Sequence, residues 1–184
     1  MELTNIGVIK DLFERHGFSF TKSLGQNFLV NPAVCPKIAE FGGAKAGVCA
    51  LEIGTGVGVL TKELATRCEK VIAVEIDTSL KPILEETLAD YDNVEIVFAD
   101  VMETDLAALL AEKAPGMEVV VCANLPYYIT TPVLAALLES RAFEAVTVMV
   151  QKEVAQRICS PAGKGDYGAF SVFCQYYAEP ELLF

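Results

Sequence analysis

The stretch Asn124-Leu125-Pro126-Tyr127 places a side-chain amide, a proline and an aromatic ring directly after an apolar run. The amide oxygen of Asn124 and a nearby main-chain carbonyl, such as that of Leu125, can accept hydrogen bonds from an exocyclic amine, while Pro126 stiffens the turn and offers no donor. Tyr127 presents a ring face on which a flat base can stack. The stretch therefore suits group transfer to the amine of a base that has been flipped out of its helix. By itself it is also typical of a plain turn that ends a strand.

Three further polar or glycine-rich groups follow apolar runs. Gly54, Gly56 and Gly58 form a glycine-rich turn, Glu75 comes 21 positions after Gly54, and Asp100 follows the next run. Glycines let a ligand approach the backbone closely, and a carboxylate can accept hydrogen bonds from both hydroxyls of a ribose. A second carboxylate can accept one from an adenine amine. Either acid alone would be interpreted as a helix cap or a solvated loop residue, but the three groups together predict an adenosine-containing cofactor.

The apolar pattern predicts strands that alternate with segments of helical length and spacing. The predicted strands are Val48–Ile53, Lys70–Ile76, Val94–Ala99, Glu118–Cys122, Ala145–Val150 and Glu181–Phe184. The predicted helices are Leu60–Arg67, Ser79–Ala89, Asp105–Lys113, Pro132–Glu139 and Lys152–Ser160. This alternation predicts an α/β, Rossmann-like fold with an open, mostly parallel sheet and helices on both faces. Crossovers of one hand bring the C-terminal strand ends to one edge, where such folds bind ligands.

Length and composition set the class of protein. The 184 residues suit one domain, with an N-terminal arm and helices over residues 1–47 and a core over residues 48–184. No apolar run is long enough to span a membrane and the start shows no signal-peptide block, so we expect a cytoplasmic protein. Six cysteines without a C-x-x-C pair and a single histidine predict no metal site and a reducing compartment. The net charge of −11 has the wrong sign for gripping a phosphate backbone.

The glycine turn, the two acids and the tetrapeptide are together typical of S-adenosylmethionine (SAM)-dependent methyltransferases. A dinucleotide-dependent oxidoreductase is the alternative, but the glycines follow G-x-G-x-G rather than G-x-G-x-x-G. From Leu24 to Phe184 the chain closely resembles the ribosomal small-subunit RNA adenine dimethyltransferases. The strings that carry the resemblance are KSLGQNFL, LEIGTGVGVLT, VIAVEID, FADVMETD, NLPYYITTPVL, VMVQKEVAQRI and DYGAFSVFCQYYAE.

The resemblance implies SAM as cofactor and dimethylation of two adjacent adenines in a hairpin of small-subunit (16S) rRNA, on the immature small ribosomal subunit. It also assigns roles by motif position. Asn27 and Leu29 line the methionine end of the cofactor, Gly54 lies beneath it, Glu75 holds the ribose, Asp100 contacts the adenine, Asn124 faces cofactor and target amine, and Tyr127 stacks on the target base. No heptad pattern is present, so we expect a monomer.

Three other identities stay open. Erm-type methyltransferases of large-subunit rRNA are related, but their corresponding string reads more like NIPYNIST, whereas NLPYYITTP and VQKEVAQRI favour the small-subunit enzymes. Mitochondrial transcription-factor relatives form another branch. An assembly factor that docks on the immature subunit, with methylation secondary, belongs to a different class. An Asn124→Ala change would separate it from an enzyme, because docking would survive while dimethyladenosine would vanish.

The resemblance has one departure. The family continues with an F-x-P-x-P-K-V-x-S segment and a small helical C-terminal domain, which these 184 residues lack. The last predicted strand also runs to the chain end. Both features indicate the first part of a longer protein and reduced methylation by this chain. The basic residues that remain for phosphate contact are Lys10, Arg15, Lys22, Lys152, Arg157 and Lys164.

Overall fold

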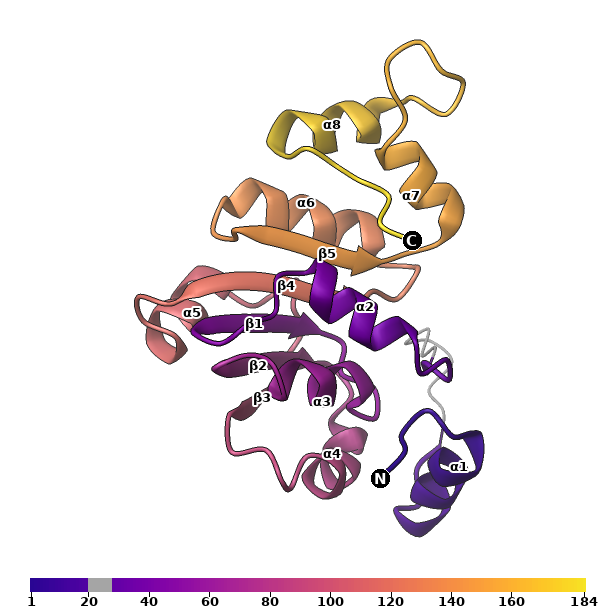
Figure 1. Cartoon of the computed structure of the whole chain (residues 1–184), viewed down its shortest axis with the longest axis vertical. Coiled ribbons are helices and arrows are strands. Elements are labelled where there is room, and N and C mark those ends of the chain that lie inside the picture. Colours follow the sequence, from indigo (N-terminus) through magenta and orange to yellow (C-terminus); the bar gives the residue numbers. More distant parts are fainter. Residues whose placement is uncertain (20–27) are drawn as a thin grey trace.

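The computed structural model describes residues 1–19 and 28–184, with a five-stranded sheet at its centre (Figure 1). The strands are β1 (Val48–Ile53), β2 (Lys70–Glu75), β3 (Val94–Phe98), β4 (Glu118–Asn124) and β5 (Ala145–Met149). The helices are α1 (Ile6–Arg15), α2 (Val34–Phe41), α3 (Val59–Ala65), the short 3-10 helix η2 (Thr78–Leu80), α4 (Lys81–Thr87), α5 (Leu106–Lys113), α6 (Thr130–Ser140), α7 (Lys152–Ile158) and α8 (Ala169–Tyr177). The α/β fold predicted from the alternation of apolar runs and helical segments is confirmed.

The strand order is β3-β2-β1-β4-β5, and every neighbouring pair is parallel. The chain runs outward from β1 through β2 to β3, then crosses back to β4 on the other side of β1. Val48 of β1 pairs with Glu118 of β4, and Asn124 pairs with Met149 of β5. Ligands in open parallel sheets bind where the strand order reverses. The C-terminal ends of β1, β2 and β4 meet at that point.

Alternate residues of the central strands face two different helix layers. Ala50 of β1 shares an apolar cluster with Ile38 of α2 and Leu64 of α3. Leu51, its neighbour in β1, shares another cluster with Leu137 of α6 on the opposite face. Strands covered on both faces bury every side chain, which explains why the sequence of β1 reads as an almost continuous apolar run.

The N-terminal helix α1 packs beside α4 at the lower end of Figure 1. Leu12 and Phe13 of α1 are buried in one apolar cluster with Ile83 and Leu84 of α4. The side chain of Asn5 accepts hydrogen bonds from the second and third backbone N–H groups after it and so caps the start of α1. Ile96 and Phe98 of β3 pack against the same cluster, so α1 lies on the β3 side of the sheet.

Most predicted elements are confirmed, with ends that differ by a few residues. Ser79–Ala89 begins as η2 and continues as α4, and β4 extends two residues further than predicted, through Asn124. The prediction of a strand at Glu181–Phe184 is wrong, because these residues have no regular structure and no ladder partner. The ring of Phe184 instead stacks on Phe41, with centroids 6.0 Å apart. Helix α8 was not predicted. No helix in the described ranges is long and apolar enough to cross a membrane.

Candidate functional site

A cavity opens at the C-terminal edge of the sheet, beside the switch point. Its lining contains all but one of the predicted site residues that lie in the described ranges: Leu29, Gly54, Glu75, Asp100, Asn124, Leu125 and Pro126. These residues come from the ends of β1, β2, β3 and β4 and from the segment before α2. Residues far apart in the sequence therefore meet in one cavity, as the parallel topology requires. Asn27 lies outside the described residues.

The glycine turn after β1 shapes the floor of the cavity. Gly54, Gly56 and Gly58 all have positive φ angles, of 78°, 54° and 90°. Side chains with a Cβ rarely adopt this backbone region, so the turn requires glycine. The N–H of Gly54 donates to the carbonyl of Val74, 2.9 Å away, which ties the turn to β2. The resulting backbone leaves room for a ligand above Gly54.

Glu75 at the end of β2 is held by the same turn. One of its carboxylate oxygens accepts hydrogen bonds from the Thr55 hydroxyl at 2.9 Å and from the Gly56 N–H at 3.2 Å. The other accepts from the Asp77 N–H at 2.9 Å. The side chain is only 5% exposed. Because a carboxylate has about four acceptor positions, these three bonds fix its orientation and leave capacity for a ligand hydroxyl.

Asp100 and Tyr128 form the side of the cavity beyond Glu75. One carboxylate oxygen of Asp100 accepts from the Met102 N–H at 2.8 Å, so a local turn holds the acid after β3. Partial burial raises the pKa of Tyr128, and the negative charges of Asp100 and Glu75 raise it further. The phenol and both acids therefore share one electrostatic environment. An adenine ring could lie between the apolar wall and the Asp100 acceptor.

The tetrapeptide continues β4 and then turns sharply. The N–H of Leu125 donates to the Met149 carbonyl at 3.2 Å, which extends the β4–β5 ladder past Asn124. The Pro126 carbonyl accepts from the Ile129 N–H at 3.2 Å and from the Thr130 hydroxyl at 3.1 Å. No described residue donates to the Leu125 carbonyl. The Pro126 carbonyl is thus used within the turn, whereas the Leu125 carbonyl can accept a hydrogen bond from a ligand.

The two tyrosines of this turn differ in placement. Tyr128 lines the cavity, whereas Tyr127, predicted to stack on a target base, does not. Tyr127 is 54% exposed to solvent. Stacking on a target base stays a prediction for Tyr127. Its exposed ring would be accessible to a base that arrives from solvent. Sequence reasoning missed Tyr128, although the doubled tyrosine offered the signal.

Sequence reasoning also missed Glu52, the acid in the middle of the β1 run. Its side chain lines the cavity and is 1% exposed. One of its carboxylate oxygens has no hydrogen-bond partner among the described residues. Burial raises the pKa of Glu52 to about 8, and the charge of Glu75 acts in the same direction, while the nearby Thr61 opposes it. A buried acid without a full set of partners is a costly feature and points to a cationic ligand group.

Phe28 and Leu29 form the remaining wall of the cavity. The Phe28 ring lies so close to the glycine turn that a Cβ at Gly56 would be 3.3 Å from it. On its other side, the Phe28 ring meets that of Phe13 in α1, with centroids 5.2 Å apart. The wall therefore connects α1 with the floor of the cavity.

The described residues contain no cluster of histidine, cysteine or acidic side chains arranged to hold a metal ion. The six cysteines are all unpaired thiols, and five of them are buried. Burial raises the pKa of Cys122, for example, to about 12, so this thiol is neutral near pH 7 and acts as an apolar side chain.

Comparison with known proteins defines first the class of the fold. A dimethyladenosine transferase from Plasmodium falciparum matches with a TM-score of 0.67 and 29% identity, over 79% of this chain and 50% of that one. The 23S rRNA methyltransferase ErmE matches with a TM-score of 0.66 and 32% identity, over 80% of this chain and 55% of that one. The fold is that of the Rossmann-like methyltransferases. More specifically, residues 17–184 match the model of the Ribosomal RNA adenine dimethylase family, and the chain belongs to that family.

A curated relative provides a comparison at the level of sequence. Ribosomal RNA small subunit methyltransferase A of Alkaliphilus oremlandii is 46% identical over 175 residues, which cover 95% of this chain and 61% of the relative. The chain thus spans about three fifths of the length of that relative. The resemblance predicted from the motifs is confirmed at the level of the family.

Proposed function

We propose that this chain is the cofactor-binding methyltransferase domain of a SAM-dependent enzyme that dimethylates two adjacent adenines of small-subunit rRNA at their exocyclic amines. One observation carries the proposal. Glu75, Asp100 and Asn124, from the ends of β2, β3 and β4, line one cavity around the glycine turn. Ribose, adenine and a reacting amine each require an acceptor, and the three side chains supply these acceptors along one edge. The division into an arm, residues 1–47, and a core, residues 48–184, is part of the proposal.

The residues of the cavity fit the cofactor in charge as well as in shape. Gly54 leaves the backbone open to close approach, and Glu75 is preoriented for ribose hydroxyls by its three hydrogen bonds. Asp100 would accept from the adenine amine. The unpartnered oxygen of Glu52 would accept from the ammonium group of the methionine moiety. Leu29 would cover that end, and the role assigned to Asn27 stays a prediction.

The bound cofactor supplies an electrophilic methyl group on a cationic sulfur. The residues of this chain would prepare the amine that receives it. Asn124 and the Leu125 carbonyl would accept its two N–H groups, which favours the pyramidal form in which the nitrogen lone pair is available. Pro126 holds the turn rigid, and Tyr127 would support the ring. Since placement of the reacting atoms supplies most of such a rate enhancement, no strong base is needed, and the proton would leave to solvent.

The sequence, and not the fold, favours small-subunit over large-subunit rRNA as the substrate. The structural matches include both a dimethyladenosine transferase and a 23S rRNA methyltransferase, so the fold does not separate the two substrates. The 46% identity to a small-subunit enzyme and the string NLPYYITTP favour small-subunit rRNA. We infer that the partner is the immature small ribosomal subunit. A cytoplasmic location and a monomeric state stay predictions.

Methyl transfer to small subunits would test the proposal. The chain, its Asn124→Ala variant and the full-length Alkaliphilus oremlandii relative would each be incubated with labelled SAM and small subunits that lack the modification. Dimethyladenosine would then be measured by mass spectrometry of the digested RNA. We expect product from the relative and from this chain, with less from the chain, and none from Asn124→Ala. Product formed equally by Asn124→Ala, or cofactor binding that fails in the unaltered chain, would overturn the proposal.

A further inference from the structure

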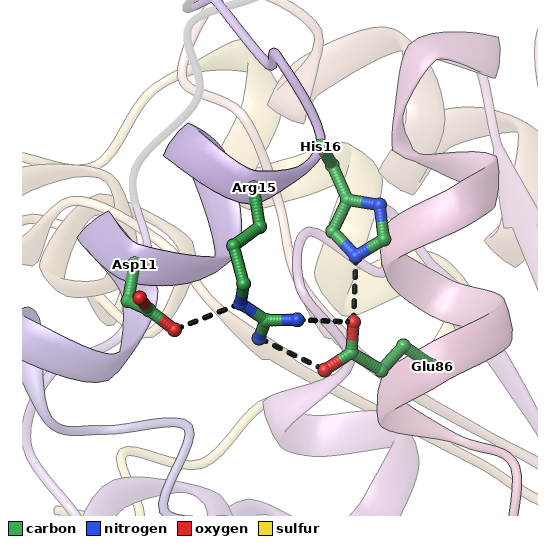
Figure 2. A network of polar contacts seen from close by, with 4 residues as sticks. All are labelled: Asp11, Arg15, His16 and Glu86. Atoms are coloured by element: carbon green, nitrogen blue, oxygen red, sulfur yellow. Dashed lines mark hydrogen bonds and ion pairs between the residues drawn. The ribbon is translucent and has the colours of Figure 1, made fainter.

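An ionic cluster connects the C-terminal end of α1 to α4. Figure 2 shows Arg15, the last residue of α1, and the next residue, His16, pointing toward the carboxylate of Glu86 in α4, with Asp11 on the other side of Arg15 from Glu86. The Arg15 guanidinium donates to both oxygens of Glu86, at 2.9 Å each, and also to Asp11 at 2.9 Å. A ring nitrogen of His16 lies 2.6 Å from Glu86. Glu86 thus receives three contacts from two consecutive residues.

The chemistry of the cluster keeps it ionic over a wide pH range. Hydrogen bonds from Arg15, and then from His16, lower the pKa of Glu86 to about 2. The guanidinium pKa rises in turn because of Glu86 and Asp11. A two-point contact between guanidinium and carboxylate fixes orientation as well as distance. This contact therefore adds a directional constraint to the apolar packing of α1 against α4.

The orientation of α1 matters because α1 carries Phe13. The ring of Phe13 is 6% exposed and meets the ring of Phe28 at a centroid distance of 5.2 Å. Phe28 in turn lines the cofactor cavity and touches the glycine turn at Gly56. A continuous path of contacts therefore runs from Glu86 through Arg15 and α1 to Phe13, and from there to the cavity wall. Protein interiors are close-packed, so a small rotation of α1 displaces the rings along this path.

We propose that Arg15 and His16, through Glu86, position the Phe28 wall of the cavity and thereby set the affinity for the cofactor. The proposal rests on the cofactor site proposed above. None of the four residues of the cluster lines the cavity, so they act as positioning residues and not as ligands. Their contribution to stability is expected to be small because Arg15 is 46% and Glu86 30% exposed. Their effect on cofactor affinity is therefore measured separately from their effect on stability.

Binding of S-adenosylhomocysteine, measured by calorimetry well below the unfolding temperature, tests the proposal. Glu86→Gln should weaken binding about two- to fivefold, the range of partly exposed ion pairs. The control is Glu63→Gln, which removes a similarly exposed pair with Arg67 at 2.7 Å, on α3. It should leave the affinity unchanged while lowering the melting temperature by a similar amount. Arg15→Gln should match Glu86→Gln, and the double variant should be no weaker, because both changes remove one interaction.

A Phe28→Ala background shows whether the effect passes through the wall. In that background Glu86→Gln should cost no further affinity. Equal affinities for the unaltered chain, Glu86→Gln and Glu63→Gln would overturn this inference alone, as would an undiminished effect of Glu86→Gln without Phe28. Failure of the unaltered chain to bind S-adenosylhomocysteine would instead overturn the cofactor site itself, and this inference with it.

Discussion

Replacing Glu52 by glutamine should change both the pH dependence of stability and the pH dependence of cofactor binding. The folded-state pKa of Glu52 is about 8, raised from 4.5 mainly by burial. Between these two values the folded chain keeps a proton that the unfolded chain has lost. The wild-type chain therefore loses stability as pH rises from about 4.5 to about 8. The full loss corresponds to about 5 kcal/mol, at about 1.4 kcal/mol for each tenfold change in proton affinity.

Glutamine has nearly the same shape and does not titrate in this range. Glu52→Gln should therefore remove this loss, so that the variant gains stability relative to wild type as pH rises toward 8 and above. Urea unfolding at several pH values would measure the difference between the two chains. A stability difference that does not change between about pH 5 and pH 9 would refute the reasoning about burial.

Cofactor affinity should depend on pH in the opposite direction from stability and increase as pH rises. The ammonium group of S-adenosylhomocysteine would pair with ionised Glu52, so wild-type binding requires loss of the Glu52 proton below pH 8. We expect wild-type affinity to rise with pH up to about 8, by as much as tenfold for each pH step of one, and that of Glu52→Gln to lack this rise. Calorimetry would measure the affinity of both chains at each pH. The ratio of the two affinities cancels the titration of the ligand itself, which affects both chains equally. Parallel pH profiles would contradict the assignment of Glu52 to the ammonium group.

Three further predictions concern the core and the cavity. Gly42→Ala should destabilise the chain by about 1–3 kcal/mol in urea unfolding, because its Cβ would lie 2.4 Å from the Cys122 sulfur. Gly165→Ala, which has open space around the same atom, should be nearly neutral, and equal effects would contradict the clash. Leu51→Ala should cost about 2–5 kcal/mol, since the side chain is fully buried in the sheet, and a loss below about 1 kcal/mol would show that the site collapses. Glu75→Gln should weaken S-adenosylhomocysteine binding about tenfold or more in calorimetry, the cost of losing a charged acceptor, and unchanged affinity would exclude it as the ribose acceptor.

The sheet could be predicted because its strands are covered on both faces. β1 and β2 appear as apolar runs of the right length, and each is followed by a turn or helix signal. α8 was missed because Ala169–Tyr177 is rich in aromatic residues, which have modest helix propensity. The four residues Glu181–Phe184 had a strand-like composition but form no ladder. A strand is defined by its partner, and a sequence pattern does not specify whether a partner is available.

The candidate site could be predicted where a motif fixes a backbone position. Glu75 and Asn124 follow or end strands, so topology alone places them at the same edge. Glu52 was hidden inside an apolar run, although an acid that interrupts such a run is itself a signal. Tyr127 and Tyr128 differ by one position, and only the geometry of the turn after β4 decides which ring enters the cavity. Contacts such as Arg15 to Glu86 join residues 71 positions apart and leave no local pattern.

The position of β1 at the centre of the sheet has a consequence for the order in which the chain can fold. Cys49 pairs with Lys70 across 21 positions, whereas Val48 pairs with Glu118 across 70. The strands that present the glycine turn, Glu75 and Asp100 can therefore associate before β4 has left the ribosome. Until then the second edge of β1 has no partner, and unpaired strand edges invite association with other chains. Newly made chains should therefore pass through a stage in which the glycine turn, Glu75 and Asp100 are already in place while the wall of the cavity contributed by the turn after β4 is missing.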